Sequence, residues 1–147
     1  MRDEEWLALR MNQIWEMLFP EVDRLNNVVV RFKGKWKNKF GHIKRLKNRD
    51  TEIAINALFK DIRVPEYIID LTIAHELVHY YHGFNSPHDR KYRHPHKGGI
   101  VDRELRKRGF SHMMMKEKNF VRNEWMPIFN SYIKRKDYSL RSFFSFR

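Results

Sequence analysis

A single domain of the α+β class is the fold that the sequence predicts, and three observations support it. The chain has 147 residues, an ordinary length for one domain. Hydrophobic residues make up 41% of it, enough to build a core. Their spacing is helical towards both ends of the chain and alternates in between, at residues 27–59. We therefore expect an N-terminal helix, a sheet of about three strands, a buried helix and C-terminal helices within one domain, residues 1–147.

The first half of the chain is predicted to contain the N-terminal helix and two strands. Apolar residues recur at near-helical spacing over residues 4–18, and Asp3 can cap the start of this helix. Over residues 27–46 the period changes to two, which indicates two strands with a turn or bulge near Gly34 or Gly41.

The second half begins with a third strand, at residues 51–59, and a helix that is apolar nearly all round, which indicates burial. Pro65 stands at the favoured first position of this helix, which runs to about Tyr81, and Gly83 can end it. The remaining segments are predicted to be a loop at 84–99, a short helix at 100–107, a helix at 116–134 interrupted near Pro127, and a C-terminal tail at 139–147.

The composition limits the functions that the chain can have. Cysteine is absent, which excludes disulfides, thiolate zinc sites and cysteine nucleophiles. No secretory signal is visible, and no apolar stretch approaches the roughly 18 residues of a membrane span, so we expect a soluble, intracellular monomer. The net charge of +12 favours polyanionic partners, nucleic acid first.

Six of the eight histidines fall between residues 72 and 99, and the first two belong to an HExxH motif. His75 and His79 are four residues apart on the predicted buried helix, so both imidazoles project from one face and can bind one ion. Zinc suits nitrogen ligands, and a catalytic zinc site takes three from the protein. Glu76 does not ligate in such a motif and can accept a proton from water that the ion activates. The sequence therefore predicts a site for one Zn²⁺ ion, with Glu76 as general base.

The third ligand stays open on the residues alone. His82 follows His79 too closely to turn back easily to the ion, whereas His96 stands at a loop-to-helix junction that could be packed rigidly. A fold whose third ligand is a helical glutamate would use Glu104 instead. The candidates are His82, His88, His94, His96, Asp102 and Glu104.

The stretches INALFKDIRVPEYIIDLTIAHELVHYYHGF and HPHKGGIVDRELRKRG resemble the SprT-like metallopeptidases, the family of bacterial SprT and the eukaryotic protease Spartan. The resemblance covers about residues 27–110, the catalytic core of the family. It implies a small zincin-like metallopeptidase fold, the zinc ligands His75, His79 and His96, and the general base Glu76.

Two features depart from the family pattern. A glycine usually follows the third histidine directly, where this chain has Lys97, and some members carry a cysteine zinc ribbon that this chain lacks. The YgjP-like metallopeptidases share the strand and the HExxH helix, but their third histidine follows much sooner. They are the second choice.

Basic residues are concentrated after the first predicted strand. Between residues 31 and 39 every second residue is Lys or Arg, and no acid occurs between residues 31 and 49. In a strand this alternation would produce one wholly basic face. We interpret it as a surface for nucleic-acid phosphates. The candidate contacts are Arg31, Lys33, Lys35, Lys37, Lys39, Lys44, Arg45 and Lys47.

The substrate is expected to bind along the strand that precedes the motif helix. Residues 51–57 would pair with an extended peptide by edge addition. Tyr92, Arg93 and His94, or His88, could supply a donor to the oxyanion.

Together these features predict a zinc endopeptidase, and the family resemblance implies protein substrates on DNA, such as covalent DNA–protein crosslinks. The alternative is a nucleic-acid-binding module in which zinc is structural and no peptide is cleaved.

Overall fold

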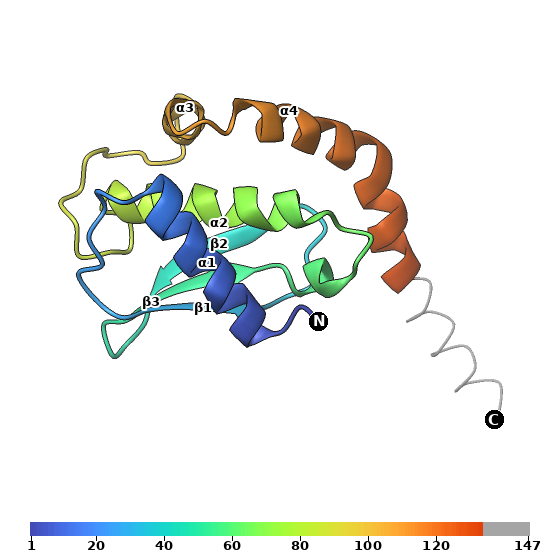
Figure 1. Cartoon of the computed structure of the whole chain (residues 1–147), viewed down its shortest axis with the longest axis horizontal. Helices are drawn as coiled ribbons and strands as arrows, with labels where there is room; N and C mark the ends of the chain where they lie inside the picture. Colours follow the sequence, from blue (N-terminus) through green and yellow to red (C-terminus); the bar gives the residue numbers. More distant parts are fainter. Residues whose placement is uncertain (134–147) are drawn as a thin grey trace.

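The computed structural model describes residues 1–133, and its elements follow the predicted order (Figure 1). The helices are α1 (Glu4–Leu18), η1 (Ala57–Lys60), α2 (Glu66–Tyr81), α3 (Ile100–Lys107), α4 (Ser111–Phe120) and the π-helical segment η2 (Val121–Trp125), and the strands are β1 (Val28–Phe32), β2 (Gly41–Arg45) and β3 (Thr51–Ile55). The α+β class is confirmed. The tail predicted at 139–147 lies outside the described residues. None of the helices within residues 1–133 is long and apolar enough to cross a membrane.

The three strands form one mixed sheet in the order β1-β3-β2. β3 pairs in parallel with β1 and antiparallel with β2. Because side chains alternate along a strand, the register places Val30, Ile43 and Ile53 on one face, and all three are buried. α1 packs against β1 and α2, and α2 packs against β2 and β3. The core therefore lies between this face and the two helices.

The predicted helix boundaries are confirmed for α1 and α2. The Asp3 carboxylate accepts a hydrogen bond of 2.8 Å from the backbone N–H of Trp6, which caps α1. Pro65 immediately precedes α2, and Gly83 follows its end with a left-handed φ of +76°. Most side chains of α2 are buried, as expected for a helix that is apolar nearly all round.

The predicted basic strand is wrong beyond Phe32, because residues 33–40 form a loop. The Lys33 N–H still donates to β3, but Gly34 then adopts a left-handed φ of +79° and turns the chain away from the sheet. The loop is held by Asn56, whose side-chain amide donates to two of its carbonyls, those of Trp36 and Lys39, at 2.8 and 2.9 Å.

The C-terminal helix begins at Ser111 rather than at residue 116, and it continues through residues 126–133. Its irregularity is the π-helical segment η2, which ends two residues before Pro127. Proline has no N–H to donate to the preceding turn, which explains a break in the regular hydrogen bonding here. Within η2, the buried Trp125 donates from Nε1 to the Lys37 carbonyl at 2.8 Å and so also fixes the loop at 33–40.

Candidate metal centre

Three of the predicted metal ligands lie together at one end of α2. The ring centroids of His75 and His79 are 5.0 Å apart, and those of His79 and His96 are 4.6 Å apart. Two imidazoles bonded to one zinc ion through bonds of about 2.0–2.1 Å, at tetrahedral angles, have centroids roughly 5 Å apart. The loop after α2 has thus brought His96 back to the motif helix. Phe84 packs against the rings of both His79 and His96.

The buried imidazole of His79 fits a metal ligand. Its residue is 1% exposed, and within residues 1–133 neither Nδ1 nor Nε2 has a hydrogen-bond partner. Leaving such nitrogens unpaired costs free energy, which coordination would recover. Burial, followed by the neighbouring imidazole of His75, lowers the pKa of His79 to about 3, so the ring is neutral and can donate a lone pair. Among the described residues, however, no three His, Asp or Glu side chains already have their donor atoms arranged around one point.

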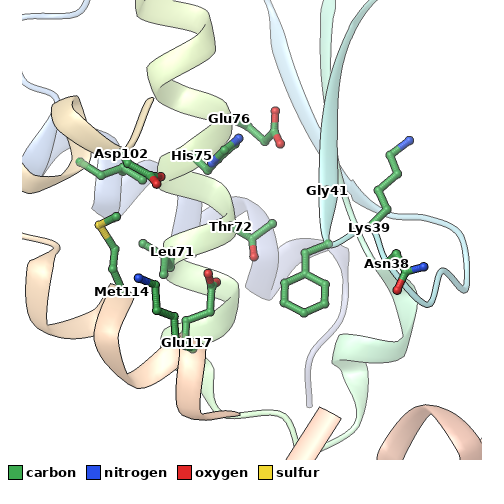
Figure 2. Close-up of a pocket in the computed structure, with 13 residues that line it drawn as sticks. Asn38, Lys39, Gly41, Leu71, Thr72, His75, Glu76, Asp102, Met114 and Glu117 are labelled. Atoms are coloured by element: carbon green, nitrogen blue, oxygen red, sulfur yellow. The ribbon is translucent and has the colours of Figure 1, made fainter. Parts of the chain in front are cut away.

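Glu76 is a buried carboxylate without a partner. The residue is 4% exposed, and among residues 1–133 no group hydrogen bonds to its side chain or forms an ion pair with it. Burial raises the pKa of Glu76 to about 8, and the charge of Lys39 only partly offsets this effect. In Figure 2, Glu76 extends from α2 towards the strand that begins at Gly41.

A groove of about 360 Å³ runs over the face of α2 that carries Glu76. Its floor is formed by Leu71, Thr72, His75 and Glu76, which are spaced to share one helix face. Residues 38–41 form one wall, and side chains from α3 and α4 form the other (Figure 2).

The other histidine candidates point elsewhere. His82 is buried against the ring of Tyr92, with centroids 4.8 Å apart. The His88 ring nitrogen Nε2 lies 2.7 Å from the carbonyl oxygen of Asp23. His94 is exposed. Among the histidines of the loop at 84–99, His96 is therefore the one whose ring lies against a motif histidine.

The two acidic candidates for the third ligand are separated by the structure. Asp102 lines the groove, and its charge partly opposes the effect of burial, which lowers the pKa of His75. Glu104 faces the other way, where its charge acts on His82 and its carboxylate lies 3.7 Å from Arg108.

The predicted oxyanion donors do not line the groove. Tyr92, Arg93 and His94 border a separate, shallow hollow on the loop after α2. His88 is directed to Asp23. Within residues 1–133, the groove beside Glu76 therefore receives none of the four side chains proposed for this role.

The predicted pairing of residues 51–57 with a substrate is wrong, because β3 is the central strand and both of its edges are occupied. The open edge belongs to β2. The backbone groups of its even-numbered residues hydrogen bond to β3. Two flanking hydrogen bonds fix this register: the Asn56 N–H donates to the Phe40 carbonyl, and the Leu46 N–H donates to the Asp50 carbonyl. The backbone groups of Gly41 and Ile43 therefore point away from β3, and Ile43 uses only its carbonyl, to accept from Asn85.

Gly41 allows β2 to approach α2 closely. A Cβ atom at this position would lie 2.8 Å from both the Ala54 carbonyl oxygen and the Thr72 Cγ2, and 3.6 Å from a carboxylate oxygen of Glu76. A side chain here would therefore force β3 or the side chain of Thr72 to shift.

The eight predicted nucleic-acid contacts are all exposed, but they do not form one strand face. Arg31 belongs to β1, and Lys44 and Arg45 belong to β2, whereas Lys33, Lys35, Lys37 and Lys39 lie on the loop at 33–40 and Lys47 follows β2. The register places Arg31 and Lys44 on the face of the sheet opposite the helices. Trp36, with Lys39 4.5 Å above its ring, lies outside the hydrophobic core.

Part of this basic surface does have a compensating acid, contrary to the sequence interpretation. Glu52, 1% exposed on the central strand, lies 3.1 Å from Lys33 and 3.5 Å from Arg31. Burial raises the pKa of Glu52, but the hydrogen bond from Lys33 and the charges of Lys33 and Arg31 outweigh it, so the net shift is downwards. The acid was missed because it comes from another strand.

Sequence reasoning also missed Glu117, which lines the groove from α4. Burial, assisted by the charge of Asp102, raises its pKa to about 7. The spacing of Glu117 in the sequence could have identified it. It stands three residues after Met114 and seven after the buried Phe110, which places it on the inward side of the helix.

Comparison with known proteins found no match. No family model matches the chain, and neither do any curated protein or solved structure. The resemblance to SprT-like metallopeptidases stays a prediction from the motifs.

Proposed function

We propose that the chain is a zinc-dependent endopeptidase that acts on DNA-associated proteins. The observation that carries the proposal is Glu76, a buried carboxylate without a partner, which lies beside His75 on the floor of an open groove. A structural carboxylate at this depth would be paired, because burying an unpaired one costs free energy. Perturbed carboxylates of this kind are typical of sites that transfer protons.

Zinc would be held by His75, His79 and His96. When bound, the ion polarises a carbonyl group and lowers the pKa of water. The neutral ring of His79 and its unpaired nitrogens are suited to this binding.

Glu76 would act as general base and then as general acid. With a cation bound beside it, Glu76 would be ionised despite the pKa of about 8 that burial gives it. Its carboxylate takes a proton from the attacking water as the bond between the water oxygen and the carbonyl carbon forms. The same carboxylate then delivers this proton to the peptide nitrogen as the C–N bond breaks, so that the amine leaves neutral. Because the side chain is buried, bulk water competes little for the proton.

An extended peptide would bind by adding a strand to the open edge of β2. Within residues 1–133, the Gly41 N–H and carbonyl and the Ile43 N–H have no hydrogen-bond partner, so they can pair with a substrate backbone. Gly41 also lines the groove, so the added strand would lie next to Glu76. Backbone pairing accepts many sequences, which suits an endopeptidase with varied protein substrates.

DNA association is supported by the exposed basic side chains on the loop at 33–40. This loop is held by Asn56 and Trp125, so Lys35 and Lys37 extend from a fixed backbone. Phosphate contacts of this kind do not depend on sequence and weaken as salt increases. Residues 38–41 of the same segment form a wall of the groove, so DNA bound to the loop would lie close to the proposed cleavage site.

The test is cleavage of a basic DNA-binding protein by the purified, zinc-loaded chain, with and without DNA. Glu76→Gln should lower the rate by at least about 100-fold while zinc remains bound, since a positioned general base contributes about that much or more. Glu124→Gln, an exposed acid elsewhere, is the matched control. Lys35→Gln/Lys37→Gln should reduce the stimulation by DNA without lowering the DNA-free rate.

The outcomes separate the alternatives. Cleavage that depends on Glu76 but not on DNA would keep the peptidase and remove the DNA-associated substrate. The alternative function, a nucleic-acid-binding module with a structural zinc, is favoured by the same basic loop. It would be supported by stoichiometric zinc, tight DNA binding and no cleavage.

A further inference from the structure

The wall of the groove formed by α3 and α4 is acidic and apolar, unlike the opposite wall. Asp102 on α3 and Glu117 on α4 line it, together with Met114 (Figure 2). Leu105 on α3 lines it as well. Leu71 on the floor continues the apolar surface. The groove therefore combines hydrocarbon walls with two carboxylates a short way from the general base.

Neither carboxylate has a partner in the protein. Among residues 1–133, no hydrogen bond and no ion pair within 4.0 Å joins Asp102 or Glu117 to another side chain. This is unexpected in a chain with 30 Lys and Arg residues against 18 Asp and Glu, because a carboxylate in such a chain has many possible cations. Lys118 and Lys39 also line the groove, but both are exposed and pair with neither acid.

The two acids differ in how the fold supports them. Asp102 is exposed and lies in the first turn of α3, where the helix dipole stabilises a negative charge. Glu117 has neither advantage, because it is half-buried and stands beyond the first turn of its helix. Repulsion from Asp102 adds to the effect of burial on its pKa, and a cation between them would relieve both effects.

A third carboxylate lines the same groove. Glu76, 4% exposed, opens onto the same space and also lacks a partner. A substrate strand on the edge of β2 would direct alternate side chains across the groove, towards α3 and α4.

We propose that the acidic wall binds a lysine or arginine side chain of the substrate, next to the bond on which Glu76 acts. The methylene groups would pack against Leu71, Leu105 and Met114, and the charged end would lie between Asp102 and Glu117. The inference rests on the proposed peptidase activity and names its substrate class, namely basic proteins. A side chain of this shape fits better than a bare metal ion, because Leu71, Leu105 and Met114 offer an apolar surface beside the two carboxylates.

The first experiment is digestion of a peptide pool with random residues by the zinc-loaded chain, followed by identification of the cleavage sites. Lys and Arg should be enriched about tenfold at one position beside the cleaved bond. Glu117→Gln should reduce the enrichment to about twofold, and Glu117→Lys should favour Asp and Glu there. Glu124→Gln, an exposed acid outside the groove, should leave the enrichment unchanged. Unchanged enrichment in Glu117→Gln would overturn the proposal.

A binding experiment keeps the inference separate from catalysis. Zinc-loaded Glu76→Gln protein, which should not cleave, is titrated with fluorescent peptides that carry lysine or norleucine at the same position. The lysine peptide should bind about tenfold more tightly, and this preference should disappear when Glu117→Gln is added. If wild-type protein cleaves nothing but the preference holds, the peptidase proposal fails and the basic-side-chain site stands. Equal binding of the two peptides would overturn the site. So would a second zinc ion per chain that Glu117→Gln removes.

Discussion

Glu76 and Glu52 are buried almost equally, with 4% and 1% of their surface exposed. Their pKa values are nevertheless shifted in opposite directions. Glu52, on the outer side of the sheet, is paired with Lys33 and Arg31, and its pKa is lowered despite its burial. Glu76, on α2, has no partner, and burial raises its pKa to about 8. The comparison teaches that partners, rather than depth, distinguish a structural carboxylate from one available for chemistry.

The largest expected effect concerns the ligands beside Glu76. His96→Ala should lower zinc affinity by at least about 100-fold, because it removes one of the three proposed ligands. His94→Ala, two residues away on the same loop, should change it by less than about threefold, since this exposed ring does not contact the motif. Competition with a chromophoric chelator measures both affinities. Equal losses of zinc affinity in the two variants would show that His96 is not a ligand.

The two glutamates should respond to the same substitution with opposite signs. In metal-free protein at neutral pH, Glu76→Gln should raise the free energy of unfolding by roughly 1–3 kcal/mol. With a folded-state pKa of about 8, Glu76 must take up a proton when the chain folds at this pH, and the amide has no such cost. Glu52→Gln should lower it by about 1–2 kcal/mol, because the half-exposed cations lose their buried partner. Urea denaturation monitored by tryptophan fluorescence provides both values. A loss of stability in both variants would contradict the comparison.

The stabilisation that Glu52 provides through its ion pairs should decrease at acid pH. Its folded-state pKa lies below its ordinary value of 4.5, so the stabilisation is complete above about pH 4.5 and is lost as the pH falls through the folded-state pKa. The difference in stability between wild type and Glu52→Gln should therefore be constant from pH 6 to 8 and shrink towards pH 3. Denaturation curves over this range would show it, and a difference that grows at acid pH would refute the assignment.

The smallest expected effect is a difference in stability between substitutions of Lys33, which pairs with Glu52, and of Lys47, which does not. Lys33→Gln should destabilise the protein by about 0.5 kcal/mol, because its ion pair is half-exposed. Lys47→Gln should change the stability by less than that, since this lysine is exposed on the turn after β2. Thermal unfolding at low and high salt would detect the difference, which should decrease with salt. Equal effects of the two substitutions would mean that Glu52 depends mainly on Arg31.

Local signals in the sequence were enough for the motif helix but not for the sheet. α2 was predictable because its apolar residues, Pro65 and Gly83 all indicate the same boundaries. The order β1-β3-β2 was not, because an alternating pattern identifies a strand without saying which strands pair with it. The central place of β3 is set by contacts between segments far apart in the sequence.

The candidate site shows the same division. The spacing of His75, Glu76 and His79 defines their helix face, so these residues could be predicted from the motif. His96 needed the resemblance to a family, since the path of a loop is not encoded in a local period. Glu117 was missed because the start of α4 was predicted too late, at residue 116, which left its inward side undefined.

The close approach at Gly41 has a consequence for the ancestry of this chain. A Cβ there would lie too close to the carbonyl of Ala54 and to Thr72, so a homologue that keeps the groove is expected to keep a glycine at this position. A glycine about 34 residues before the first histidine of HExxH, at the start of a short strand, should persist in distant relatives after the surrounding sequence has diverged. Searching genomes for that pair of features would identify kin that overall sequence similarity does not reveal.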